Sequence, residues 1–138
     1  MTTVVDIVSR ALRVLRVVDP DESVEGRQFD TAMKALNAMM AAWEAYGRAL
    51  GWSPVANPAD EMPTPPEFDE AIAYNLACKL RPEYGVSLDP DTIDFAKSGL
   101  ALIRTTVEAN TYARLELDLP RADSQRCFDG AAGFYRGW

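Results

Sequence analysis

Histidine is absent from this sequence of 138 residues. Its absence removes the Ser-His-Asp and Cys-His nucleophile arrangements, every zinc site that contains histidine, and the side chain whose unperturbed pKa best suits proton transfer near neutrality. The phosphate-binding loop, the dinucleotide-binding glycine motif and the nucleophile-elbow motif are also missing. We therefore expect no enzyme, no cofactor and no metal site.

Cysteine is scarce, and long apolar runs are missing. Cys78 and Cys127 do not form a CxxC pattern, and no stretch of about 18 apolar residues or signal peptide is apparent. We expect free thiols, synthesis in the cytoplasm and no membrane association.

Basic residues are outnumbered, 14 against 21 acidic residues, so the net charge is -7. An acidic chain has little affinity for the phosphates of nucleic acids or for an anionic membrane surface. DNA could pass close to such a protein without specific binding. The length is that of one domain, which buries roughly 68% of its unfolded surface.

Two helices are predicted in the first third of the chain. Thr3 and Asp6 resemble a capping box, and the apolar spacing that follows predicts a helix to about Val18. A second helix is expected from about residues 24–28 to Tyr46, with Gly47 as a left-handed cap. Its apolar residues are spaced by 4, 3, 4 and 3, which is typical of helix packing: Phe29, Met33, Leu36, Met40 and Trp43.

Residues 48–66 contain five prolines and are predicted to form a long loop. Trp52 and Val55 favour extended geometry, so residues 51–55 could form an edge strand or a short hairpin. A loop of this length suggests a function or a partner contact. The alternative is a clamp that covers one end of the core with Trp52.

Residues 67–85 predict a short, densely apolar helix that ends at Arg81, before Pro82. Asp69 and Glu70 are expected as first-turn charges, although a pair of carboxylates could also hydrolyse a glycoside. Asn75 must find hydrogen-bond partners if it is buried. We expect four residues to organise the core: Trp43, Asn75, Leu76 and Leu80.

Asp89, Pro90 and Asp91 predict the start of another helix, which should pack against the second one. Gly99 permits close approach of a neighbouring backbone. The apolar seam is lost at Asn110, and residues 111–119 suit either an extended strand or a frayed helix. The expected fold is all-α: a small four-helix bundle over residues 1–119, with a proline-rich loop.

Residues 120–138 differ from the rest and predict an extended C-terminal arm. They contain three glycines and four aromatic residues, and residues 121–138 carry a charge of +1 against -8 for residues 1–120. Arginine and aromatic enrichment is typical of interface anchors. The predicted partner-binding residues are Arg121, Arg126, Phe128, Phe134, Tyr135, Arg136 and Trp138. Alternatively, the tail folds back on its own domain.

Two segments resemble one known family: AMMAAWEAYG at residues 38–47 and NLACKLRPEYG at residues 75–85. They resemble the adaptor proteins of short-tailed bacteriophages, called head-completion, tail accessory or packaged-DNA stabilisation proteins. The order of the helices, the loop and the tail extends the resemblance to roughly the whole chain. The motifs are not catalytic.

The resemblance implies a structural virion protein at the head-tail interface, made in the host cytoplasm. Such adaptors form a ring, typically of twelve copies, beneath the portal protein, where they help to retain packaged DNA until ejection. The implied partners are the portal, neighbouring copies, and tail nozzle or tail fibre and spike proteins. The C-terminal arm would bind the portal.

Two alternatives stay open at this point. The chain could be a small soluble interaction or regulatory module that binds a partner through its aromatic tail. A third possibility is that the chain is a muralytic enzyme that uses Glu70.

Overall fold

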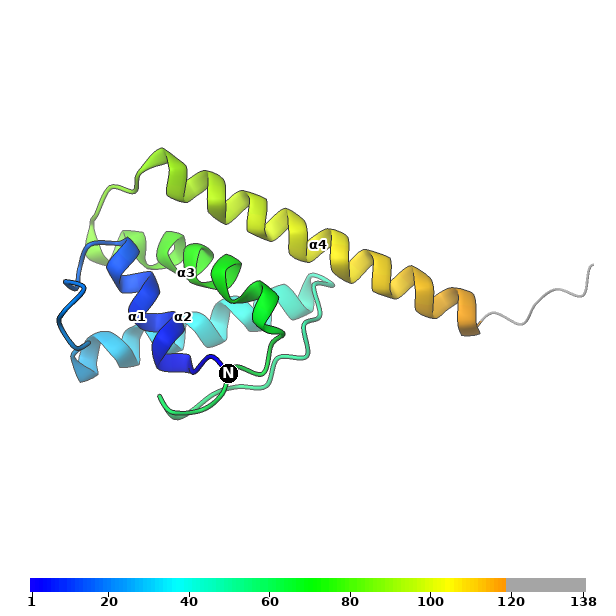
Figure 1. Cartoon of the computed structure of the whole chain (residues 1–138), viewed down its shortest axis with the longest axis horizontal. Helices are drawn as coiled ribbons and strands as arrows, with labels where there is room; N and C mark the ends of the chain where they lie inside the picture. Colours follow the sequence, from blue (N-terminus) through cyan, green and yellow to red (C-terminus); the bar gives the residue numbers. More distant parts are fainter. Residues whose placement is uncertain (119–138) are drawn as a thin grey trace, which may run out of the picture. The chain divides into compact units, whose positions relative to one another are not determined.

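A computed structural model describes residues 1–118 of the chain, and side chains as far as residue 113. The elements in order are α1 (Val4–Val14), α2 (Gly26–Ala45), the 3-10 turn η1 (Pro66–Phe68), α3 (Asp69–Tyr84) and α4 (Pro90–Asp118). Figure 1 labels the four α-helices along the chain. The predicted all-α fold with four helices is confirmed. Residues 1–118 contain no β-strand, only an isolated antiparallel bridge between Thr3 and Glu61, so the hairpin considered for residues 51–55 is wrong.

Helix α3 lies at the centre of the core because it is apolar on several sides. It contacts both α1 and α2, and α1 also contacts α2. The predicted residues Phe68, Ile72, Leu76 and Leu80 are all buried, and Ala73 and Ala77 have no exposed surface. Alanines allow the neighbouring helices to approach closely, while the leucines fill the space between them.

The first helix ends at Val14, four residues earlier than predicted. Arg16 has a left-handed backbone with φ of 57°. The N–H groups of Arg16 and Val17 donate to the carbonyl oxygens of Arg13 and Leu12, at 2.9 and 3.1 Å. This is the Schellman arrangement, in which the left-handed position is usually glycine. The sequence therefore carried no visible stop signal here.

The same arrangement ends α2, where the sequence does carry the signal. The N–H groups of Gly47 and Arg48 donate to the carbonyls of Glu44 and Trp43, at 3.1 and 2.9 Å. Gly47 has φ of 79°, as expected for a left-handed cap. The predicted end of α2 is confirmed within one residue.

The prediction that Pro82 ends the central helix is wrong, because α3 continues through Pro82 to Tyr84. Proline has a φ that suits a helix, and its main penalties are a lost N–H donor and a clash with the preceding turn. Near the end of a helix these penalties affect only one turn. Gly85, with φ of 62°, is the residue at which α3 stops.

Helix α4 starts at Pro90, and the carbonyl of Asp89 accepts hydrogen bonds from Thr92 and Ile93. The helix continues through Asn110 to Asp118, so the stretch that suited either a strand or a frayed helix is helical in its described part. The chain divides into two compact units within α4, the first being Met1–Val107 and the second starting at Glu108.

Within the first unit, α4 packs on α3, whereas the sequence had predicted α2 as its neighbour. A Cβ atom added to Gly99 would lie 2.6 Å from the Cβ and 3.0 Å from the Cα of Ala71, so these two small residues let the backbones approach. One turn away, the Asn75 side chain donates to the carbonyls of Ala71 and Ala96, at 2.8 and 2.9 Å. Asn75 thus finds the partners that its position required, and it joins α3 to α4.

The first turn of α1 is held by a capping box. The backbone N–H and the hydroxyl of Thr3 both donate to one carboxylate oxygen of Asp6, at 3.0 and 2.6 Å. These bonds, the hydroxyl first, lower the pKa of Asp6 below its ordinary value of 3.8. The capping box predicted for α1 is confirmed, with Asp6 in the position that Glu or Gln usually occupies.

We predict that Gly99→Ala destabilises the protein by about 1–3 kcal/mol, because the added methyl group must displace Ala71. In an exposed helix, the replacement of glycine by alanine stabilises the helix by about 1 kcal/mol. The steric cost at Gly99 therefore has to exceed that gain. Gly26→Ala is the matched control, since nothing lies within 4 Å of a Cβ at Gly26. Thermal melting followed by circular dichroism measures both. A Gly99→Ala variant at least as stable as the Gly26→Ala variant would contradict the close contact.

We predict that Thr3→Val raises the pKa of Asp6 towards 3.8, because the hydroxyl bond is the largest cause of its lowering. The lowered pKa stabilises the folded state above pH 3.8, and this contribution is lost as the pH falls through the folded pKa. The variant should therefore lose stability relative to the wild type at neutral pH, but not at pH 2. NMR titration of the Asp6 carboxyl measures the shift, and an unchanged pKa would refute the assignment.

Candidate functional site

The predicted partner-binding residues of the tail lie outside the described residues. They are Arg121, Arg126, Phe128, Phe134, Tyr135, Arg136 and Trp138. The four core-organising residues are described: Leu76 and Leu80 have no exposed surface, Trp43 is 7% exposed, and Asn75 bonds α3 to α4.

Two polar side chains of α2 hold the proline-rich loop against the bundle. The Asn37 amide donates to the carbonyl of Val55 and accepts from its N–H, at 3.0 and 3.1 Å. The Glu44 carboxylate accepts from the N–H groups of Leu50 and Trp52, at 3.1 and 2.9 Å. Sequence reasoning missed both residues. Their spacing of two helical turns on α2 was the available signal, because it places them on one face.

The far end of the loop covers the start of α1. The N–H groups of Val4 and Val5 donate to the carbonyls of Asp60 and Pro58, at 2.9 and 3.0 Å. The first N–H groups of a helix have no partner inside it, so the loop satisfies two of them. Val55 is buried and Trp52 packs against the core, which supports the expectation of a clamp.

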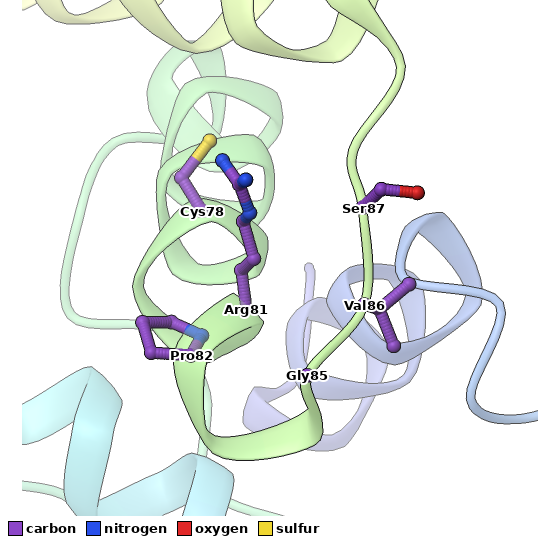
Figure 2. A pocket seen from close by; sticks show the side chains of 6 residues that line it. All are labelled: Cys78, Arg81, Pro82, Gly85, Val86 and Ser87. Atoms are coloured by element: carbon purple, nitrogen blue, oxygen red, sulfur yellow. The ribbon is translucent and has the colours of Figure 1, made fainter.

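A shallow recess of about 580 Å³ lies between the end of α3 and the segment that leads to α4. Figure 2 shows the side chains of Cys78 and Arg81 pointing to the same side of α3, with Ser87 on the segment that connects α3 to α4. Burial raises the pKa of the Cys78 thiol, and the nearby charge of Arg81 opposes this effect only in part. A raised pKa disfavours the thiolate, so this recess does not provide an activated nucleophile.

One carboxylate of each acidic pair has a structural partner. The Asp60 carboxylate accepts from the N–H of Asn57 at 3.0 Å, which lowers the pKa of Asp60 and stabilises a turn. Asp69 and Glu70 occupy the first turn of α3, as predicted, and Glu70 forms an ion pair of 2.7 Å with Arg10 of α1. In the described part of the chain, no three Asp, Glu, Cys or His side chains are grouped to hold a metal ion.

A groove of about 270 Å³ between α3 and α4 presents apolar side chains to solvent. Tyr74 and Phe95 stack with ring centroids 5.4 Å apart, and the Arg10 guanidinium lies over Tyr74 at 5.7 Å. Phe95 and Leu102 are 57% and 55% exposed. They lie two turns apart on α4, outside its buried seam, a pattern that the sequence contained and that our prediction did not use. Exposed apolar groups gathered in a groove are typical of protein-protein contacts.

A known protein family matches most of this chain. The family model of the P22 tail accessory factor matches residues 1–130. The chain belongs to this family. The resemblance to the adaptors of short-tailed bacteriophages is thereby confirmed, and the matched region includes the whole described bundle and the first predicted tail residues.

Membership of the tail accessory factor family makes this a structural protein of a bacteriophage that works with other tail components of the virion. Such factors are structural, which agrees with the expectation that the chain is not an enzyme. Among the described helices, none combines the length and the apolar character needed to span a membrane.

We predict that Asn37→Ala frees the proline-rich loop while the helices stay folded. The variant loses both bonds to Val55 and leaves that buried backbone without partners, a cost of about 1–3 kcal/mol. Limited proteolysis should cut residues 48–66 faster than in the wild type. Asn110→Ala, a change at an exposed position of α4, is the control and should leave the cleavage rate unchanged. Equal cleavage in both variants would refute the clamp.

Proposed function

We propose that this protein is the adaptor that joins the phage portal to the tail, as a ring of copies around the path of the DNA, and that it helps to retain the packaged genome. The observation that carries the proposal is the family match over residues 1–130. The partners are the portal protein, neighbouring copies, and tail nozzle or tail fibre and spike proteins. The expected place is the head-tail interface, after synthesis in the host cytoplasm.

The bundle suits a rigid platform in such an assembly. Its loop is bonded to α2 through Asn37 and Glu44 and to α1 through Asp60. A surface that is already ordered loses little conformational entropy when a partner binds. The groove with Phe95 and Leu102 is the apolar surface of the described bundle that we assign to contacts within the ring or with the tail.

The charge of the protein supports contact with DNA without specific binding. The chain carries a net charge of -7, and residues 1–120 carry -8. A ring of acidic subunits repels phosphates, so DNA can slide through it during ejection instead of adhering to its wall. Retention of DNA then has to come from closure of the channel by the assembled tail and not from affinity for the genome.

The C-terminal arm is proposed to bind the portal. Arg121, Arg126 and Phe128 fall inside the region matched by the family model. The three tail arginines and four tail aromatics provide charge-assisted bonds and large buried areas, which dominate the energy of many interfaces. An arm that becomes ordered only on the portal would also delay ring formation until the portal is present.

Deletion of residues 120–138 tests the arm. We expect the truncated protein to keep the helical circular dichroism of the bundle and to stop co-sedimenting with portal particles. The matched control is the full chain with Ser124→Ala and Gln125→Ala, which alters the arm without removing a proposed anchor. A second variant replaces Phe134, Tyr135 and Trp138 by alanine and should bind the portal at least about tenfold more weakly. Unchanged co-sedimentation of the truncated protein would refute the proposal that the arm binds the portal.

A further inference from the structure

A pocket at the start of α3 contains buried polar atoms without hydrogen-bond partners. It has a volume of about 180 Å³, and its lining includes Glu61, Thr64 and Asp69. Thr64 is only 6% exposed, and its hydroxyl oxygen has no partner. One carboxylate oxygen of Asp69 is also buried and unpartnered. Buried polar groups are almost always satisfied, so each of these two atoms needs a hydrogen-bond partner, either water or a ligand.

The pocket is held in place from three sides. Glu61 forms the bridge with Thr3, and the N–H of Met62 donates to the carbonyl of Thr2 at 3.0 Å. Asp69 is the first residue of α3. Thr64 precedes Pro65 and Pro66, whose rings restrict the backbone. The donors and acceptors are therefore fixed before a ligand arrives, which reduces the entropic cost of binding.

The chemistry of the lining selects the kind of ligand. The two carboxylates repel anions, and together with the hydroxyl oxygen they can accept several hydrogen bonds, so the ligand should be a cation that donates several of them. A calcium ion needs six to eight oxygen ligands, and the described residues do not group three acidic side chains anywhere. A guanidinium group carries five N–H donors in a plane and binds carboxylates with two parallel bonds.

We propose that this pocket receives an arginine side chain from a neighbouring protein chain, with Asp69 and Glu61 as carboxylate acceptors and Thr64 as a hydroxyl acceptor. The volume equals that of about six water molecules, so water can fill the pocket before the guanidinium displaces it. The site shares no lining residue with the α3–α4 groove. It gives the bundle a polar, geometrically specific contact in addition to its apolar one.

Agmatine, which carries a guanidinium at one end of a four-carbon stem and an ammonium group at the other, is the probe for this site. Titration of the ¹⁵N-labelled full chain should give saturable shifts of the Thr64 and Asp69 backbone amides. Asp69→Asn and Thr64→Val should each weaken binding about tenfold or more, because the first removes the negative charge and one carboxylate oxygen and the second removes the buried hydroxyl. Glu67→Gln is the matched control: it removes one negative charge two residues from Asp69 but does not line the pocket, and agmatine binding should be unchanged.

The competing cations are tested in parallel with 1,4-diaminobutane and calcium chloride. Agmatine should bind more tightly than 1,4-diaminobutane, which has the same charge and stem but an ammonium group in place of the guanidinium. The proposal is overturned if agmatine gives no saturable shift, if Asp69→Asn binds it as the wild type does, or if calcium saturates the same amides more tightly than agmatine. Glu61→Gln, which leaves α3 intact, provides the loss-of-binding test if Asp69→Asn does not fold. The assay uses the isolated chain, so a negative result would not contradict the proposed adaptor ring.

Discussion

The structure depends on the burial of α3 by the other helices. This helix has apolar residues on several sides, and its alanines and leucines have little or no exposed surface. An isolated helix of this length is marginal in water, so α3 is stable only when α1, α2 and α4 cover it. The close contact of Ala71 with Gly99 and the two bonds of Asn75 fix the position of α4 on this helix. The groove beside Phe95 and the pocket beside Asp69 both lie on α3, so both surfaces are set by how it packs.

Periodicity and capping chemistry were sufficient to predict most of the helices. Three features were visible in the sequence because each depends on neighbouring residues. They are the apolar seam of α2, the glycine cap at Gly47 and the start of α4 at Asp89–Pro90. Two helix ends were wrong. At α1 an arginine occupies the left-handed position that normally requires glycine, and in α3 a proline is tolerated in the last turn. At α1 the hydrogen bonds of Arg16 and Val17 to the last turn hold the left-handed position, and in α3 the penalties of the proline affect only one turn.

The contact surfaces were harder to predict than the helices, for a physical reason. Asn37 and Glu44 are ordinary polar helix residues until the loop folds back and offers them backbone partners. The unpartnered hydroxyl of Thr64 becomes informative only when the bridge at Glu61 and the start of α3 enclose it. Such groupings join residues that are distant in sequence or separated by a turn, and no local pattern encodes them. The interface of the tail stays a prediction from composition, because its residues lie outside the described part of the chain.

These features describe a small, rigid and acidic subunit whose specificity lies in its surfaces, as suits a tail accessory factor. The central claim, that copies of it form a ring between portal and tail, is tested most directly by electron microscopy of the full chain mixed with purified portal rings. The account predicts a continuous additional ring on one face of the portal, with a fixed number of copies for each portal subunit. Portal rings that stay bare, or that carry scattered single copies without closing a ring, would contradict it.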